Sequence, residues 1–200
     1  MAEWLVGRPF AVGLVTLILM SADWLLTRLQ ERERQPHYSQ HYRTYPVDTI
    51  EGNPFLRAAV ADQRIVEPKH LLPAIVLSAV VAYASTLLPS VWCPVFLGCV
   101  WGLFLIVGSS HLGNVIGYRV GRRGIHGKVW MHQRTAGLIQ TGRYASLALL
   151  LVFLAFCSGS TFVAGAAVSG VTSSLRQFLW LWKLPAIPFD DACPTSAGDA

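Results

Sequence analysis

Three long stretches of the chain carry no charged side chain, and this feature constrains the fold more than any other. No Asp, Glu, Lys or Arg occurs between Arg8 and Asp23, from His70 to Tyr118, or from Tyr144 to Leu175. An ordinary soluble domain is excluded, because 53% of the 200 residues are hydrophobic and only 14% are charged. The charge-free stretches are typical of membrane spans.

The lengths of these stretches predict four membrane-spanning helices. A span needs about 20 apolar residues to cross about 30 Å of hydrocarbon. The 48 residues from 71 to 118 are therefore long enough for two helices, and Leu88, Pro89 and Ser90 supply a turn because proline lacks an amide proton. We expect an all-α integral membrane four-helix bundle over residues 1–185 and a polar tail over 186–200. The expected spans are 9–28, 71–88, 93–118 and 145–167.

The first span also resembles a secretory signal peptide, with a charged flank before an apolar core. Glu3 offsets the charge of Arg8, and no small-x-small cleavage triplet is clear. We therefore expect this span to be retained.

The basic residues are distributed unevenly and predict the orientation. Residues 28–69 contain seven Lys and Arg and residues 119–143 contain six, which leaves Arg8, Arg176 and Lys183 elsewhere. Loops near membrane spans accumulate Lys and Arg on the cytoplasmic side. With four spans, both loops would be cytoplasmic and both termini would face outward, in a bacterial inner membrane. The pI of about 9.3 thus reflects topology, and no nucleic-acid partner is expected.

Two ionisable residues fall inside the predicted spans. Asp23 precedes Arg28 by five residues and His111 precedes Arg119 by eight, so both lie towards the cytoplasmic side. Such groups are expensive in lipid unless they face protein or water, so they are functional candidates. Each also lies on a helical stripe with spacings of three and four: Gly13, Thr16, Met20, Asp23 and Thr27, and Phe104, Val107, His111, Asn114 and Tyr118. If the stripes face each other, Asp23 or Thr27 can hydrogen-bond with His111 and Asn114.

A third polar element, Glu51 to Pro54, lies in the first cytoplasmic loop. Asn53 can cap a short interfacial helix that begins at Pro54 and continues with charged residues among apolar ones as far as Val66. Glu51 would then precede this helix and could point into the cytoplasmic mouth of the bundle.

The end of the chain has an aromatic segment and a polar tail. Residues 178–182 (Phe-Leu-Trp-Leu-Trp) lie between Arg176 and Lys183, and we expect this amphipathic segment to lie in the membrane interface or against a partner. The tail is expected to be disordered unless docked. No C-x-x-C motif is present, and whether Cys93 and Cys193, both expected on the outer side, form a disulfide is left open.

The chain resembles a family of small prokaryotic multi-pass membrane proteins of unknown function. The resemblance rests on Asp23 and Thr27 one turn apart, on Glu-x-Asn-Pro at residues 51–54, and on His111 and Asn114 in a later span. It covers about the first 120 residues, and the segment from Arg28 to Ile50 is longer than that family's usual connection. The resemblance implies no activity, but it implies that these polar positions form one group.

The most specific hypothesis for this group is a metal or proton site. Asp23, Glu51 and His111 would be the ligands, with Thr27, Asn53 and Asn114 around them. Two carboxylates and an imidazole suit a divalent ion such as Zn, Mn or Fe, and metal-bound water could hydrolyse a lipid or a membrane peptide. Against this, the chain has no H-E-x-x-H motif.

Two other classes of function remain open. A protonatable Asp–His pair could serve a small oligomeric transporter or channel, with Gly165, Ser169, Ala166 and Gly170 as small-residue faces for self-association. Alternatively the polar residues only fix helix register, and the protein is an accessory or scaffold subunit of a membrane complex. The last is the main expectation, with lipids and other membrane subunits or a second copy of the chain as partners.

Overall fold

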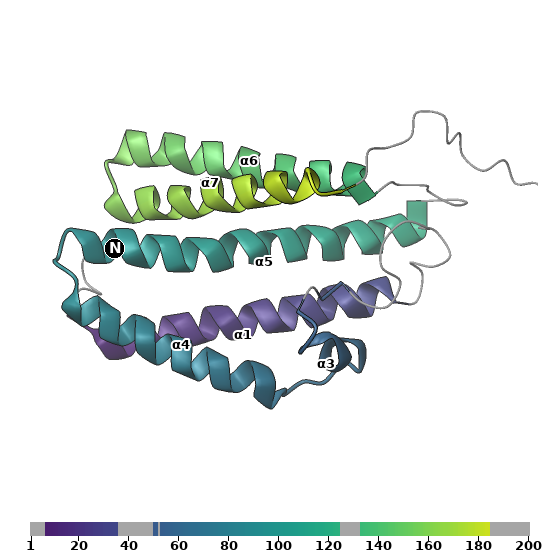
Figure 1. Cartoon of the computed structure of the whole chain (residues 1–200), viewed down its shortest axis with the longest axis horizontal. Helices are drawn as coiled ribbons and strands as arrows, with labels where there is room; N and C mark the ends of the chain where they lie inside the picture. The colour runs from purple at the N-terminus through teal and green to yellow at the C-terminus, as the bar shows by residue number, and fades with distance from the viewer. Residues whose placement is uncertain (1–6, 36–49, 52, 125–132, 185–200) are drawn as a thin grey trace, which may run out of the picture.

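The fold is all-helical in a computed structural model, which describes residues 7–35, 50–51, 53–124 and 133–184. These residues form six helices and no strand (Figure 1), which confirms the predicted fold class. The helices are α1 (Pro9–Arg34), α3 (Arg57–Ala61), α4 (Pro68–Leu87), α5 (Trp92–Gly124), α6 (Gln133–Ser158) and α7 (Thr161–Leu181).

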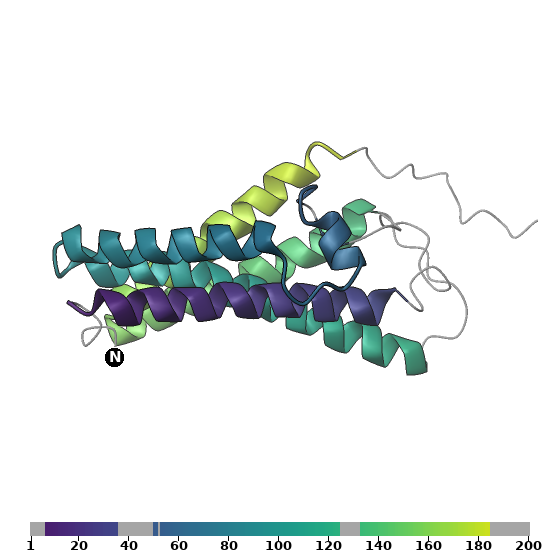
Figure 2. The same ribbon diagram turned by 90° about the horizontal axis from the view of Figure 1, so that it is seen from below.

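The five long helices alternate in direction along the chain, so α1, α5 and α7 run one way and α4 and α6 the other (Figure 1). Their order in space differs from their order in the chain. α5 lies between the α1–α4 pair and the α6–α7 pair (Figures 1 and 2), and it packs mainly on α1 and α7. Its contacts with its chain neighbours α4 and α6 are few. The spatial order is therefore α4, α1, α5, α7 and α6.

Four of these helices are long and apolar enough to cross a membrane: Pro9–Arg34, Pro68–Leu87, Trp92–Gly121 and Arg134–Ser158. The protein is thus a multi-pass membrane protein by the length and composition of its helices. The first three predicted spans fall on α1, α4 and α5. The predicted hairpin turn is also confirmed, because α4 ends at Leu87 and the amide of Trp92 donates to the carbonyl of Pro89 at 2.9 Å.

The fourth predicted span, 145–167, is wrong because it straddles a helix break. α6 ends at Ser158, Gly159 adopts a left-handed φ of 60°, and the Ser160 hydroxyl accepts from the amide of Val163 at 3.4 Å to begin α7. Glycine reaches that φ without a steric penalty, and serine is a favoured N-cap. The chain therefore forms a second helical hairpin.

This hairpin brings the end of α7 back to the end of the bundle where α1 ends and α6 begins (Figure 1). Arg176 and Lys183 consequently lie at the same end as the residues that flank both predicted cytoplasmic loops. In the part of the chain that the structure describes, Arg8 is the one basic residue near the opposite end.

The contact between α5 and α7 is a close backbone approach made by small residues. A Cβ on Gly98 would overlap the carbonyl of Phe162, one on Gly165 would overlap that of Val95, and one on Gly102 would lie 2.7 Å from the Cα of Ala166. Ser169 on α7 also donates to the carbonyl of Cys99. The small residues expected to mediate self-association are therefore used inside the chain.

The core between α1, α4 and α5 contains apolar side chains and one polar link. Its buried members are Val12, Val81, Cys93, Leu97 and Trp101. The indole of Trp101 donates to the Thr16 hydroxyl at 2.9 Å, which in turn donates to the carbonyl of Val12 at 2.8 Å. All polar atoms in this link are thus satisfied, as a membrane interior requires.

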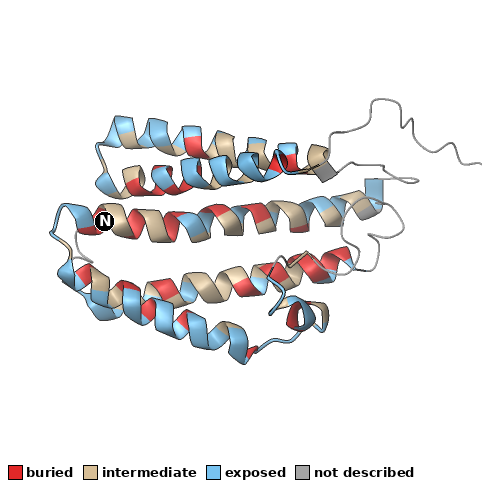
Figure 3. Ribbon diagram, in the orientation of Figure 1, coloured by how far each residue is buried: buried red, intermediate tan, exposed pale blue. Residues whose placement is uncertain are grey.

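The outward faces of the helices are mostly exposed (Figure 3). In the apolar part of α6 only 6% of the residues are buried inside the protein, and Leu149, Phe153 and Phe156 are exposed there. Apolar surface on this scale is expected of helices that face lipid. The end of α7 is likewise exposed at Phe178 and Trp182, whereas Leu181 is buried against α6. Cys193 and the tail lie outside the described residues.

Candidate functional site

A polar cluster joins α1 to α5 near the end of the bundle where α1 ends. Asp23, Thr27 and Gln30 lie on one face of α1, since spacings of four and three keep side chains together on a helix. His111 of α5 faces them. Its Nε2 lies 3.3 Å from Thr27 Oγ1 and 3.5 Å from Asp23 Oδ1, and its Nδ1 lies 2.5 Å from Gln30 Oε1.

These contacts occupy both ring nitrogens of His111. The amide oxygen of Gln30 can only accept, so Nδ1 carries the hydrogen, and in a neutral ring Nε2 then accepts from the Thr27 hydroxyl. The predicted contact of Asp23 and Thr27 with His111 is thereby found in the structure. Gln30 was missed because it lies beyond the predicted end of the first span, although its spacing of three from Thr27 continues the polar face.

Glu51 lies beside this cluster, and among the described residues its carboxylate bonds to its own turn. Its carboxylate accepts from the amide of Asn53 at 2.7 Å, and its negative charge is close enough to interact electrostatically with Asp23. The side-chain oxygen of Asn53 in turn accepts from the amide of Phe55 at 3.1 Å, in the turn that precedes the helix. The predicted cap by Asn53 is wrong, because the N-cap of α3 is Leu56 and no side chain caps it. The helix that follows, α3, begins only at Arg57 and is shorter than predicted.

The segment from Asn53 to Glu67, which we call the cap, is attached to α1 by side chains of α1. The indole of Trp24 donates to the carbonyl of Ile65 at 3.0 Å, and Arg28 donates to the carbonyl of Gln63 at 2.5 Å. Trp24 also packs on Ala59 and Val60. The cap therefore has a fixed position over the end of α1.

Asn114 does not join the cluster. Its side-chain oxygen accepts from Arg143 Nη1 of α6 at 2.9 Å. Three residues along a helix correspond to a rotation of about 300°, so His111 and Asn114 are offset by about 60° and can face different neighbours. The two ends of the predicted His-x-x-Asn motif thus serve different helix pairs.

A second set of buried polar groups lies at the end of α1 and was not predicted. Arg34 donates from Nε and Nη2 to the two carboxylate oxygens of Glu31 at 2.9 and 2.7 Å, and the amide of Ile50 donates to Glu31 at 3.0 Å. Arg119 of α5, which is itself exposed, donates to the buried Glu33 at 2.9 Å. These residues follow the predicted end of the span, where charged side chains are ordinarily solvated, so the sequence alone gave no reason to expect burial.

The predicted three-ligand metal site is not assembled. Within the described ranges, no three His, Cys, Asp or Glu side chains are grouped so that they could hold a metal ion. Of the expected ligands Asp23, Glu51 and His111, the histidine has no free ring nitrogen and the glutamate is bonded to backbone. The arrangement can hold helices together and can share a proton between Asp23 and His111.

Comparison with known proteins adds nothing to these observations. No protein-family model, curated protein or solved structure matches the chain.

Proposed function

We propose that the protein is an accessory or scaffold subunit of a bacterial inner-membrane complex, and that its polar cluster fastens α1 to α5. The observation that supports this is the complete use of the His111 ring by side chains of α1. A histidine that ligates a metal or transfers a proton to substrate needs a nitrogen that can reach it. Here both nitrogens serve the contact between two helices.

The proposed orientation places the end of the bundle that carries the cap in the cytoplasm. Lys and Arg accumulate on the cytoplasmic side of membrane proteins. This end of the bundle carries most of the basic residues, and α7 returns to it and adds Arg176 and Lys183. On this proposal the N-terminal end of α1 faces outward. On this proposal α7 also crosses the bilayer, packed on α5 and α6, although it is not one of the four helices that are apolar enough by composition. Its end is then cytoplasmic, in contrast to the expectation drawn from four spans.

The cap offers a surface for a partner subunit or for lipid headgroups. Phe55, Ile65 and Val66 are 74%, 71% and 66% exposed, although they lie outside the spans. Exposed apolar residues on a segment that is held in place by Trp24 and Arg28 favour a contact surface.

The subunit proposal predicts a defined complex without bound metal. After extraction from native membranes in mild detergent, the 21.9 kDa chain should migrate with at least one other chain at fixed stoichiometry. Elemental analysis of the folded protein should find no near-stoichiometric Zn, Mn or Fe. A monomer or simple homo-oligomer, with bound metal that is lost in His111→Ala, would instead favour an intramembrane metal-dependent hydrolase.

Proton-coupled transport is the second candidate, and one observation favours it. Asp23 Oδ1 is buried and accepts no hydrogen bond among the described residues, yet it lies 3.5 Å from His111 Nε2. A second proton on Nε2, with the Thr27 hydroxyl then accepting instead of donating, could be shared with Asp23 Oδ1 and would satisfy that atom. Proton flux into proteoliposomes that is abolished by Asp23→Asn, in protein that remains folded, would select this candidate over the scaffold.

A further inference from the structure

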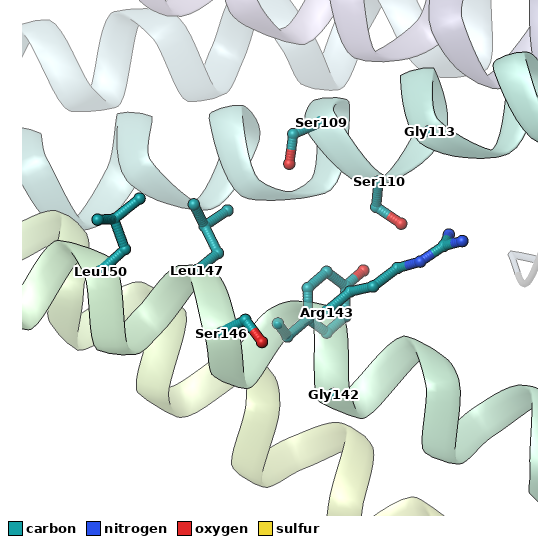
Figure 4. A pocket seen from close by; sticks show the side chains of 9 residues that line it. Ser109, Ser110, Gly113, Gly142, Arg143, Ser146, Leu147 and Leu150 are labelled. Carbon is teal, nitrogen blue, oxygen red and sulfur yellow. The ribbon is translucent and has the colours of Figure 1, made fainter.

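An open groove lies between α5 and α6, outside the polar cluster. Its volume is about 640 Å³, which falls within the range of about 300–1,000 Å³ typical of ligand sites. Arg143 and Ser110 line its polar part, and Leu147 and Leu150 line its apolar part (Figure 4). The groove therefore has the amphipathic character of a lipid.

The helix packing explains why the groove is open. The glycines of α5 and α7 bring those two backbones together, and α6 packs on α7. α6 is consequently held beside α5 with few direct contacts. Gly113 and Gly142 also line the groove, and they place no side chain in the space between the two helices.

Arg143 is positioned at the polar part of the groove. Its Nη1 donates to Asn114, and a guanidinium has five N–H donors, so further donors are available to a ligand. Asn114 precedes Arg119 by five residues, which places it about 7 Å inside the basic end of α5. This is the depth at which an arginine side chain can reach lipid phosphate from within a bundle.

The hydroxyl groups near Arg143 add to this polar part. Ser110 accepts a hydrogen bond from Gln140, which leaves its own hydroxyl hydrogen free to donate to an anion. None of the nine residues that line the groove is acidic. The site therefore has the donors and the positive charge that complement a phosphate diester.

We propose that this groove binds an anionic glycerophospholipid from the leaflet at the basic end of the bundle. The phosphate contacts Arg143 and Ser110, and an acyl chain lies along Leu147 and Leu150. Exposed Arg123, at the end of α5, adds positive charge at this end of the bundle, so a headgroup with net negative charge is favoured over a zwitterionic one. A groove with an arginine in its polar part beside an apolar part fits a lipid better than it fits an apolar helix of a partner.

The test is native mass spectrometry of the full chain, released from detergent containing equal amounts of phosphatidylglycerol and phosphatidylcholine with identical acyl chains. The wild type should retain phosphatidylglycerol preferentially. Arg143→Gln should weaken that retention about tenfold or more, since charge-assisted hydrogen bonds to phosphate are lost. Arg176→Gln, which removes an equal charge from an exposed position on α7, should leave it unchanged.

A groove-filling variant keeps the proposal falsifiable if Arg143→Gln does not fold. Leu147→Trp retains Arg143 but occupies the apolar part, and it should also lower retention of phosphatidylglycerol. Equal retention of the two lipids by the wild type would overturn the proposal. So would equal losses in Arg143→Gln and Arg176→Gln, or full competition by inorganic phosphate, which has no acyl chain.

Discussion

An Arg34→Met variant should lose about 3–5 kcal/mol of unfolding free energy, which is the cost of leaving a buried charge without its partner. Glu31 is 0% exposed and Arg34 is 2% exposed, and two hydrogen bonds join them. Methionine preserves much of the apolar stem, so the loss reports the missing guanidinium. The measurement is equilibrium unfolding in mixed micelles with increasing dodecyl sulfate.

The matched control for this variant is Arg64→Met. Arg64 is 54% exposed and pairs with Asp62, which is 56% exposed, and at 3.4 Å with Glu67, which is buried. Glu67 keeps a second partner in the amide of Lys69, so the change should cost at most about 1 kcal/mol. The double variant Glu31→Gln/Arg34→Met should recover part of the loss, because residue 31 then carries no charge that needs the guanidinium. Equal effects of Arg34→Met and Arg64→Met would show that the Glu31–Arg34 pair is solvated.

Gly98→Ala should destabilise the protein by about 3 kcal/mol, at the upper end of the usual cost of overpacking. The new methyl group would overlap the carbonyl of Phe162 and lie 3.1 Å from the amide nitrogen of Ala166. Both are backbone atoms of α7, so a side-chain rotation cannot relieve the clash. α7 has to move away from α5, which also breaks the bond from Ser169 to Cys99.

Gly117→Ala provides the control on the same helix. A Cβ there meets no atom within 4 Å, and alanine favours helix over glycine by up to about 1 kcal/mol. This variant should therefore be neutral or more stable than the wild type in the same dodecyl sulfate titration. The close contact of α5 with α7 is contradicted if both variants unfold at the wild-type midpoint.

The sequence predicted those parts of the fold whose signals are local. Pro89 marked the α4–α5 turn, and the charge-free stretches marked three spans. The α6–α7 turn was missed because Gly159 and Ser160 are small residues that also occur inside membrane helices. Arg143 and Arg176 flank one charge-free stretch, in which a single span over 145–167 was predicted. Both arginines instead lie within helices that extend beyond that stretch.

The candidate site was also predicted only where local sequence signals determine it. Depth and helical phase were enough to bring Asp23 and Thr27 to His111. They could not determine which neighbour Asn114 faces, since that depends on how α6 is placed by α7. Nor could they determine that the Glu51 carboxylate would bond to a backbone amide of its own turn. In a loop, such amides commonly compete with other groups for a carboxylate.

A double-mutant cycle between Gln30 and His111 tests most directly whether the cluster fastens α1 to α5. The variants Gln30→Met and His111→Leu and their combination remove the 2.5 Å contact while keeping apolar volume. We expect a coupling free energy of about 1 kcal/mol in dodecyl sulfate unfolding. A parallel cycle between His111 and Ser85, which donates within α4 to Ala82, should show additivity. Additivity within about 0.3 kcal/mol for Gln30 and His111 as well would show that this contact does not fasten α1 to α5.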